Sequence, residues 1–506
     1  MASNPLTVAP LDLHNQALLE KVHPPGWRNP VPRGRYNLVV LGAGTAGLVC
    51  AVGAAGLGAQ VAIVERDLMG GDCLNFGCVP SKALIRSARA AADARDAAAL
   101  GVTAQSVKVD FAAVMERMRR LRAELAANDS AERLRGLGID VFIGAGRFAA
   151  PDEIEVEGRR LRFRRAVIAT GARAAMLPIP GLAEAGCLTN ETVFSMTELP
   201  RRMAVIGAGP IGCEMAQAMS RFGSEVTLLE VEPRILIRED RDAAERIERA
   251  LIRDGVSIVT GAKVLEVRRS DRERILRVEA AGRSSEIIAD EILIGVGRAP
   301  AVDGLGLEAA GVEYDRVRGI KVDDCLRTTN RRIYAAGDCA SGLKFTHLSD
   351  AHARIVLRNA LFLGRSRVSA LTIPWCTYTD PEIAHVGLSE AEARARGIAV
   401  TTFIQEMSEV DRAVLDGETE GFLKVHVRAG SDRIVGATMV AARAGDIISE
   451  LTAAIEGGIG LGRLAEIIHP YPTQAEAIRK IADQYNRTRL TPFLAGVFRR
   501  WFEWTR

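Results

Sequence analysis

Two cysteines of the sequence lie close enough to each other to act as a pair. Cys73 and Cys78 stand five positions apart in the segment GGDCLNFGCVPSKAL, residues 70–84. A regular α-helix would separate them by about 7.5 Å along its axis, too far for a relaxed disulfide bond. If they pair, Cys73 must therefore lie at a distorted helix start, and we expect the bond to be readily reduced. The alternative is that they are two separate buried cysteines.

The residues around this segment favour reactive thiols. A thiol near the N-terminus of a helix has a lowered pKa, which makes it reactive. Pro80 suits the first turn of such a helix. The seven histidines are scattered and no Cys-x-x-Cys occurs, so we expect no structural metal site. We expect the other six cysteines to be structural, packed in the protein as small apolar side chains. They are Cys50, Cys187, Cys213, Cys325, Cys339 and Cys376.

An internal repeat is the strongest feature of the chain's organisation. Residues 38–65 read LVVLGAGTAGLVCAVGAAGLGAQVAIVE, and residues 203–230 read MAVIGAGPIGCEMAQAMSRFGSEVTLLE. The matching positions share an offset of 165 residues: Gly42, Gly44, Gly47 and Glu65 correspond to Gly207, Gly209, Gly212 and Glu230. A lone glycine motif is weak evidence, but two copies with matching acids argue against a chance repeat.

Each copy has the features of a dinucleotide site. The first glycine permits a tight turn, the second lets a pyrophosphate approach the backbone, and the third lets helix and strand pack closely. Free N–H groups at the helix N-terminus attract the pyrophosphate, and the acid after the second strand binds a ribose diol. The uncharged stretch 36–64 is also long enough for a membrane span. A glycine-rich strand–turn–helix accounts for the same residues.

The remaining segments predict the elements that position these residues. Residues 85–137 are rich in alanine, arginine and leucine and predict one or two long helices. Residues 140–170 and 256–297 predict short strands. From residue 372 onward, strand-like runs flank a Ser-Asp turn, and helices are expected at 446–456 and 474–485. Near the start of the chain, HNQALLEKVHPPGW predicts an added helix and a proline turn.

The last twenty residues, 487–506, predict a terminal helix of distinct character. Apolar side chains recur at helical spacing, at Leu490, Phe493, Leu494, Val497, Phe498, Trp501 and Phe502. Arginines make the remainder basic, at Arg487, Arg489, Arg499, Arg500 and Arg506. One interpretation is a helix packed on its own protein or on a dimer mate. The other is an amphipathic helix on a membrane surface, where basic and aromatic residues are the usual pairing.

Length and composition limit the class of protein. The chain has 506 residues and a mass of 54.4 kDa, which predicts three or four domains. Hydrophobic residues make up 48% and charged residues 25%, which excludes disorder as the main state. The net charge of +3 gives no electrostatic basis for nucleic-acid binding. Residues 1–22 lack the basic and apolar runs of a signal peptide, which favours a cytoplasmic location.

The motifs GAGTAG, GGDCLNFGCVPSK, ATGA, GAGPIGCE, VGRAP and AAGDC together resemble the flavoprotein disulfide reductase family. That family includes lipoamide dehydrogenase, glutathione reductase and mercuric reductase. The resemblance covers residues 36–486 and implies an α/β fold with two Rossmann-like dinucleotide-binding domains plus a C-terminal α+β dimerisation domain. The expected divisions are an N-terminal extension (1–35), an FAD-binding domain in two parts (36–175 and 301–371), an NAD(P)-binding domain (176–300), a dimerisation domain (372–486) and the terminal helix (487–506).

The resemblance also implies cofactors and roles. FAD would lie at the first glycine motif, against Gly42, Gly44, Gly47, Glu65, Gly71, Lys82, Thr170, Gly171 and Asp338. NADH or NADPH would lie at the second, against Gly207, Gly209, Gly212, Glu230 and Gly297. Cys78 would lie beside the flavin and give the thiolate of a charge-transfer complex, and Cys73 would exchange with the substrate. Lys82 would lie near flavin N5 in an ion pair with Glu214.

The choice of nicotinamide follows from charge. The carboxylate of Glu230 suits a free 2′-hydroxyl and repels a 2′-phosphate, which favours NADH. Arg234 and Arg238 follow closely in the sequence and could still accommodate NADPH.

The C-terminal motif departs from the disulfide-reducing members. Those members carry His-Pro-Thr followed by a glutamate, and the histidine is the acid–base catalyst. Here Tyr471 occupies the position of the catalytic histidine, and the glutamate is present as Glu476. His469 precedes Tyr471 by two residues. In an extended chain its side chain would lie on the same face but at a different distance from the substrate, so it is a weak substitute. An unperturbed tyrosine, with a pKa of about 10, is a poor base at pH 7. A soft metal ion binds thiolates directly and needs no such proton relay.

These features together favour an NAD(P)H-dependent, mercuric-reductase-like enzyme that acts on Hg(II) or another thiol-bound electrophile. Mercuric reductases are similar in having tyrosine at this position, and in the stretch REDRDAAE. Their C-terminal cysteine pair has no counterpart after Cys376, nor does their N-terminal Cys-x-x-Cys domain occur. The alternatives are a dihydrolipoamide dehydrogenase, a membrane-surface NADH:quinone-type reductase, or a flavin- and nucleotide-binding redox sensor with little turnover. The expected assembly is a homodimer in which Tyr471 and Glu476 of one chain complete the site of the other.

Overall fold

The computed structural model describes residues 8–362 and 364–506. The chain divides into two compact units. The first unit runs to Pro233 and resumes over Gly255–Leu371, and the second comprises Arg234–Asp254 and Thr372–Arg506. Residues 234–254, expected within the second nucleotide-binding domain, therefore belong to the same compact unit as the C-terminal segment.

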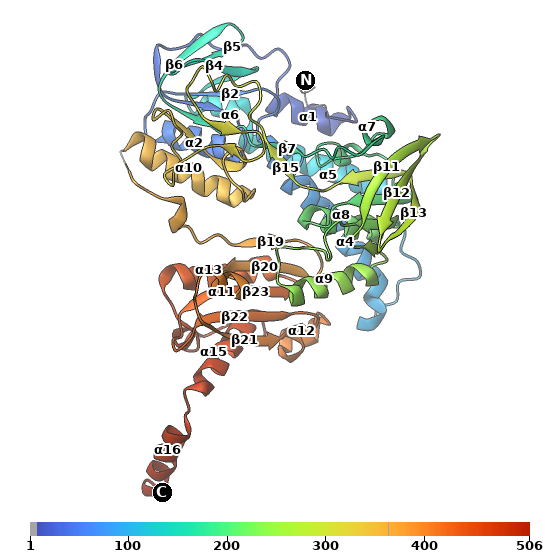
Figure 1. Ribbon diagram of the computed structural model, residues 1–506, viewed down its shortest axis with the longest axis vertical. Coiled ribbons are helices and arrows are strands. Elements are labelled where there is room, and N and C mark those ends of the chain that lie inside the picture. Colours follow the sequence, from blue (N-terminus) through green and yellow to red (C-terminus); the bar gives the residue numbers. More distant parts are fainter. Residues whose placement is uncertain (1–7, 363) are drawn as a thin grey trace. The chain divides into compact units, whose positions relative to one another are not determined.

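A seven-stranded sheet in the first unit contains the first copy of the repeat. Its strands are β3 (Asp140–Ile143), β2 (Val61–Glu65), β1 (Arg35–Leu41), β6 (Arg159–Ile168), β5 (Glu153–Val156) and β4 (Gly146–Ala150), in that order, with β18 (Ile333–Ala335) also on β6. The first four and β18 pair in parallel, and β4 and β5 are antiparallel. Helix α2 (Thr45–Gly56) joins β1 to β2, and α10 (Thr346–Leu361) packs beside α2 (Figure 1). The nearly continuous burial of β1 and β2 is typical of parallel strands covered on both faces.

A second, four-stranded parallel sheet contains the other copy. Its strands are β10 (Ser257–Val259), β9 (Glu225–Leu229), β8 (Arg202–Ile206) and β14 (Glu291–Ile294), and α8 (Pro210–Phe222) joins β8 to β9. The predicted repeat is confirmed, since β1–α2–β2 and β8–α8–β9 have the same order and the same parallel pairing. The antiparallel strands β11 (Lys263–Ser270), β12 (Glu273–Ala280) and β13 (Arg283–Ala289) form a further sheet beside it (Figure 1). Two short pairs complete the strands of this unit: β7 (Ala172–Ala174) with β15 (Arg298–Pro300), and β16 (Tyr314–Asp315) with β17 (Gly319–Ile320).

Among the described residues, the first unit has six further helices: α1 (Leu13–Val22), α3 (Gly71–Asn75), α4 (Cys78–Asp96), α5 (Phe111–Leu125), α6 (Ala131–Gly136) and α7 (Leu182–Ala185). Of these, α3 and α4 contain the cysteine segment. The expected helical region 85–137 holds α4, α5 and α6, with a loop between the first two. The expected N-terminal helix is α1, and the backbone N–H of Trp27 closes the proline turn on the carbonyl of Pro24.

The second unit is built on one antiparallel sheet. Its order is β19 (Trp375–Thr377), β20 (Glu382–Gly387), β23 (Ile434–Ala441), β22 (Phe422–Arg428) and β21 (Val400–Glu406). Its helices are α9 (Arg241–Arg253), α11 (Glu390–Ala395), α12 (Asp411–Asp416), α13 (Ala444–Gly457), α14 (Leu461–Leu464), α15 (Glu476–Thr488) and α16 (Pro492–Trp504). The helices expected at 446–456 and 474–485 are α13 and α15, so the α+β character of this segment is confirmed.

Short 3₁₀ turns lie at Ala97–Leu100, Ala126–Asp129, Val193–Ser195, Gly337–Cys339, Val368–Ala370 and Met407–Glu409. The uncharged stretch 36–64 forms most of β1 and β2 together with α2. Among the described residues, 8–362 and 364–506, we find no helix with the length and apolar character needed to cross a bilayer.

Candidate active site

The chain between the two cysteines is broken into two helices. Cys73 lies in α3, and Cys78 is the first residue of the 19-residue helix α4. Gly77 precedes α4, and a Cβ atom there would lie 2.8 Å from Asp72 Oδ2 and 3.0 Å from Asp72 O. Glycine therefore lets the chain fold back between the thiols. The sequence predicted that Cys73 lies at the distorted start of the helix that holds Cys78. In the structure, Cys73 instead lies in a separate short helix, α3.

The thiol environment separates the two cysteines chemically. The hydrogen bond from Cys73, helped by the Thr346 hydroxyl 3.5 Å away and by the nearby Lys82 ammonium, lowers the pKa of Cys78, an exposed residue, to about 6. The same bond, together with burial, raises the pKa of Cys73. The N-terminus of α4 also favours negative charge at its first residue. In the reduced pair, Cys78 is therefore the thiolate at neutral pH and Cys73 keeps its proton.

An ion pair fixes the helix that carries Cys78. Lys82 Nζ lies 2.8 Å from Glu214 Oε2, and the Glu214 side chain is buried on α8. Lys82 follows Cys78 by four residues, so both side chains lie on the same face of α4. The ion pair that the resemblance implied is thus present, and it ties α4 to the helix of the second glycine motif.

The first glycine motif has the geometry of a turn that only glycine can make. Gly42 has φ of +105°, and a Cβ there would lie 2.3 Å from Ala169 O. A Cβ on Gly47 would lie 1.9 Å from Gly42 O. Gly44 differs, because a Cβ there would meet only Gly71 Cα, at an ordinary 3.8 Å. Gly71 is itself pressed against this turn, since a Cβ on it would lie 2.6 Å from Gly44 Cα. The cysteine segment therefore begins against the first glycine turn.

The second motif repeats this geometry. Gly207 has φ of +99°, and a Cβ on Gly212 would lie 1.9 Å from Gly207 O. A Cβ on Gly209 would meet no atom within 4 Å among the described residues. The chain's own packing thus requires glycine at the first and third positions. The middle glycine keeps an open approach to the helix N-terminus, where a pyrophosphate would lie.

Both helix N-termini are suited to bind anions. In the described parts of the chain, neither α2 nor α8 has a side chain capping its N-terminus. The first N–H groups of a helix have no partner within the helix, so they remain available to phosphate oxygens. The open middle glycines and these uncapped N-termini fit two dinucleotides, one at each copy of the repeat.

The acids that follow each copy are already held by the backbone. Glu65 Oε2 accepts the N–H of Ala43 at 2.6 Å, and Oε1 accepts that of Asp67 at 2.8 Å. Glu230 likewise accepts two backbone N–H groups, those of Ala208 and Glu232. Burial raises the pKa of Glu65, which two backbone donors oppose.

The other expected cofactor positions gather around the strand pair β7–β15. Gly171 and Gly297 both have positive φ, at +70° and +114°, and Thr170 Oγ1 donates to Ala301 O at 2.7 Å. Asp338 lies in the 3₁₀ turn Gly337–Cys339, where burial raises its pKa and Arg298 opposes the shift. The structure therefore brings these residues into one region of the first unit.

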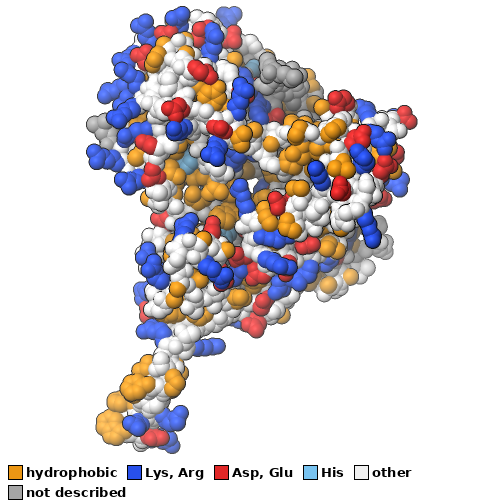
Figure 2. All heavy atoms as spheres, viewed as in Figure 1, with side chains coloured by type: hydrophobic (Ala, Val, Ile, Leu, Met, Phe, Trp, Pro, Cys, Tyr) orange, Lys and Arg blue, Asp and Glu red, His pale blue; other side chains and the backbone are white. Residues whose placement is uncertain are grey.

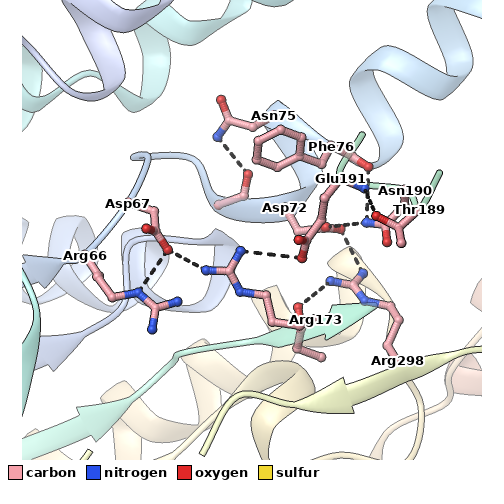
Figure 3. A network of polar contacts seen from close by, with 12 residues as sticks. Arg66, Asp67, Asp72, Asn75, Phe76, Arg173, Thr189, Asn190, Glu191 and Arg298 are labelled. Atoms are coloured by element: carbon pink, nitrogen blue, oxygen red, sulfur yellow. Dashed lines mark hydrogen bonds and ion pairs between the residues drawn. The ribbon is translucent and has the colours of Figure 1, made fainter. Parts of the chain in front are cut away.

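A polar network that sequence reasoning missed surrounds the cysteine segment (Figure 3). Arg298 Nη1 lies 2.8 Å from Asp72 Oδ2 and 3.6 Å from Asp338 Oδ2. Asn190 Nδ2 donates to Asp72 Oδ1 at 2.9 Å. Arg298 belongs to the VGRAP motif and Asp72 to the cysteine motif GGDCLNFGCVPSK, so both had a sequence signal, whereas Thr346 had none. The network balances the charge of the carboxylate next to Cys73.

The C-terminal residues with expected roles lie in the second unit. Tyr471 is 70% exposed, and its hydroxyl donates to Asp411 Oδ2 at 3.0 Å, which raises the pKa of the phenol. Glu476 is buried at the start of α15 and pairs with Arg479 at 3.0 Å. The His469 side chain is buried, with Nε2 2.9 Å from Glu450 Oε1. In this motif the Tyr471 phenol is thus exposed, whereas the His469 imidazole is buried against Glu450.

The sequence model of the family "Pyridine nucleotide-disulphide oxidoreductase" matches residues 36–353. The model of that family's dimerisation domain matches residues 373–482, which implies a homodimer. Two curated relatives and one solved structure illustrate the likeness. The chain is 35% identical over 444 residues to a mercuric reductase of Bacillus cereus, covering 88% of this chain and 70% of that protein. It is 34% identical over 462 residues to a dihydrolipoyl dehydrogenase of Bacillus subtilis (strain 168), covering 88% and 97%.

The solved structure is the Cu(II) complex of the HOCl-induced flavoprotein disulfide reductase RclA from Escherichia coli. It superposes with a TM-score of 0.80 at 27% identity, over 89% of this chain and 100% of that one. The matched family, the two glycine motifs and the paired cysteines agree with one another. This chain belongs to the pyridine nucleotide-disulphide oxidoreductase family and is an NAD(P)H-dependent, FAD-containing oxidoreductase.

Proposed function

We propose that this enzyme passes electrons from NADH through the Cys73–Cys78 pair to a soft metal ion or another thiol-bound electrophile, with Hg(II) as the first candidate. The observation that carries the proposal is the asymmetric placement of the two thiols: Cys73 lies on the short helix α3, whereas Cys78 begins α4 with its Sγ 3.5 Å from the Thr346 hydroxyl. This placement agrees with a lowered pKa for Cys78 and a raised pKa for Cys73. When bound at the first glycine motif, FAD supplies two-electron transfer between the nicotinamide and the thiols. In each turnover NADH loses two electrons and Hg(II) gains two, giving NAD⁺, Hg(0) and one proton.

The roles of the two thiols follow from their environments. Cys78 begins α4 and lies near Lys82, so its negative charge is stabilised on the protein. Cys73, on the short helix α3, is the thiol that meets the acceptor. As Cys73 loses its proton to bind a soft ion, two sulfurs become available to that ion, and soft ions favour thiolate ligands.

The exposed phenol supports a metal or electrophile over a disulfide. Splitting a disulfide requires a proton for the leaving thiolate, and an acid–base group near neutrality supplies it best. Asp411 raises the pKa of Tyr471 above its ordinary value, so the phenol gives up a proton at neutral pH even less readily than an ordinary tyrosine. In the homodimer, we expect Tyr471 and Glu476 of the partner subunit to complete each site.

NADH is the preferred donor in this proposal. Glu230 carries a negative charge where a 2′-phosphate would lie. Arg234, the first arginine after Glu230 in the sequence, donates to backbone carbonyls of its own turn: those of Leu236 at 3.0 Å, Ile237 at 2.8 Å and Glu239 at 2.8 Å.

The test is acceptor-dependent oxidation of NADH by the holoenzyme under excess small thiol. We expect Hg(II) to stimulate NADH loss over the thiol-only control, and Cys78→Ser to abolish the stimulation. Cu(II) is the second probe, because a Cu(II) complex is known for the similar enzyme RclA. If neither ion stimulates turnover while dihydrolipoamide or a small disulfide does, the enzyme is a disulfide oxidoreductase despite Tyr471, and the metal proposal is wrong.

A second candidate function is electron transfer at the inner face of a membrane, and α16 favours it. All thirteen residues of α16 are exposed or half-buried. Figure 2 shows its apolar and basic side chains next to each other. Residues 487–506 contain five arginines and a single acidic residue, Glu503, so the segment is positively charged and complementary to anionic lipid. We therefore propose that α16 lies on an anionic membrane, with a lipid-soluble acceptor as the substrate in that case.

Vesicle co-sedimentation tests the membrane proposal. The full chain is expected to bind phosphatidylglycerol vesicles and not phosphatidylcholine vesicles, and a chain ending at residue 486 is expected to bind neither. Trp501→Ala with Phe502→Ala should weaken binding without changing NADH oxidation in solution. Equal and negligible binding by the full and shortened chains, with loss of the dimer on shortening, would instead assign α16 to the dimer interface.

A further inference from the structure

Helix α1 lies ahead of residue 36, where the family match begins, yet it is packed into the first unit. Leu18 and Val22 are fully buried in the core around the first glycine motif. The carbonyl of Val22 accepts the N–H of Met69 at 2.9 Å. Met69 precedes the cysteine segment directly. The N-terminal extension is therefore attached to the chain that leads into Cys73.

A buried chain of hydrogen bonds continues from α1 to the cysteine segment. Asn15 Oδ1 accepts from Arg122 Nη2 at 2.7 Å, and Arg122 Nη1 donates to Asn75 O at 2.8 Å. Asn15, Arg122 and Asn75 are 0%, 2% and 0% exposed. Each contact joins residues that are distant in sequence, since α1, α5 and α3 contribute one member each.

Asn75, which follows Cys73, also makes hydrogen bonds to residues that precede Cys73. Its side-chain Nδ2 donates to Met69 O at 3.0 Å and to Gly71 O at 2.8 Å. Met69 and Gly71 come before Cys73, and Asn75 follows it. A helix of five residues, such as α3, is too short to hold its own conformation. Its shape must therefore come from contacts outside it, and the Arg122 guanidinium provides one at its C-terminal end.

We propose that Asn15 and Arg122 are positioning residues that hold α3 so that the Cys73 and Cys78 thiols stay within reach of each other. This inference rests on the proposed function, because it concerns the same thiol pair. Two thiols held in place have a high effective concentration toward each other, which stabilises their disulfide against external thiols. Releasing the C-terminal end of α3 lowers that concentration. The disulfide then becomes easier to reduce, and Cys73 loses its position as hydrogen-bond donor to Cys78.

The chain offers a matched control one turn away. Arg119 Nε lies 2.6 Å from Asp12 Oδ2, so this pair also joins α5 to the start of α1. Arg119 is 7% exposed, nearly as buried as Arg122. Among the described residues, Arg119 makes no hydrogen bond or ion pair with α3. A loss of stability common to both arginines can therefore be separated from an effect on the thiols.

The test uses full-length holoenzyme carrying Arg122→Met, Asn15→Ala or Arg119→Met. Methionine keeps much of the arginine volume without leaving a buried charge. Each protein is equilibrated anaerobically with glutathione redox buffers, and the peptide holding both cysteines is scored for free thiol by alkylation and mass spectrometry. We expect the disulfide of Arg122→Met to be at least tenfold more readily reduced, about 30 mV by the two-electron relation. Asn15→Ala should shift in the same direction, and Arg119→Met should stay within about twofold of wild type, well under that 30 mV.

A second readout is the pH dependence of Cys78 alkylation in the reduced enzyme. We expect the midpoint to rise in Arg122→Met and to stay unchanged in Arg119→Met. Equal shifts in the two arginine variants, or none in Arg122→Met, would overturn the inference. If wild-type protein forms no Cys73–Cys78 disulfide, the proposed function fails, and the alkylation midpoints still decide whether Arg122 positions the thiols.

Discussion

Glu65 and Glu230 hold equivalent turns in the two halves of the repeat through the same two hydrogen bonds. Glu65 accepts the N–H groups of Ala43 at 2.6 Å and Asp67 at 2.8 Å. Glu230 accepts those of Ala208 at 2.6 Å and Glu232 at 3.0 Å. Each carboxylate oxygen has a second lone pair, which can accept a ribose hydroxyl. The acid thus shapes the glycine turn as well as offering a contact to the nucleotide.

Replacing Glu230 by glutamine should shift the nicotinamide preference. The amide keeps the size of the side chain but removes one acceptor and the negative charge. We expect the KM for NADH to rise and the NADPH-to-NADH ratio of kcat/KM to increase at least tenfold, about 1.4 kcal/mol. Steady-state kinetics with both donors measures it. Glu232→Gln is the control, because its side chain is exposed and only its backbone contacts Glu230. An unchanged ratio would mean that another group selects the donor.

The middle glycines should separate binding from folding. Among the residues that the structure describes, a Cβ atom added at Gly209 meets no atom within 4 Å, and one added at Gly44 meets only Gly71 Cα, at an ordinary 3.8 Å. We therefore expect both variants to keep the wild-type Tm of the apoprotein. Gly209→Ala should weaken NADH binding and Gly44→Ala should weaken FAD retention, each at least tenfold, or about 1.4 kcal/mol.

Gly212→Ala provides the contrast to these variants. Its Cβ would lie 1.9 Å from Gly207 O, so it should lower Tm or prevent folding. Calorimetry of the apoproteins and titration with each cofactor check the two effects. Normal cofactor affinity in Gly209→Ala would show that the open approach at this turn is not used.

Removing the hydrogen-bond donor at Cys73 should raise the pKa of Cys78 toward that of an ordinary thiol. The Cys73 hydrogen bond is the largest cause that lowers the pKa of Cys78 to about 6. In reduced wild-type enzyme, alkylation of Cys78 should therefore be complete at neutral pH and fall away below about pH 6. In Cys73→Ala the midpoint should move to higher pH, so that alkylation at neutral pH slows several-fold. A midpoint that stays in place would assign the low pKa to Lys82 and the helix N-terminus.

Tyr471→His should restore disulfide chemistry if the missing acid–base group is the limitation. The imidazole titrates near neutrality, whereas the pKa of Tyr471 lies above its ordinary value because of Asp411. We expect turnover of dihydrolipoamide to increase at least tenfold, with a pH profile that follows the histidine. Tyr471→Phe serves as the control and should give no such gain. Unchanged turnover in Tyr471→His would show that substrate access, and not proton transfer, limits disulfide reduction.

Much of this protein is determined by local sequence. The two glycine motifs, the acids after their second strands and the cysteine segment each act through neighbours in the chain. Gly42 and Gly47 meet within one turn, and Cys78 and Lys82 lie one helical turn apart. Such short-range relationships appear in the sequence as fixed spacings. For this reason the repeat, several of the helices and the family could be predicted from the residues alone.

The tertiary structure decided the contacts between distant residues. Asn15, Arg122 and Asn75 come together because three helices pack, and Arg298 reaches Asp72 across 226 positions of sequence. The burial of His469 against Glu450 likewise depends on how α13 and the following loop meet. No local pattern records these partners, because each residue type is common and its spacing varies with the loops between elements. The sequence thus identifies the reactive thiols, and packing determines what holds them and which groups tune their charge.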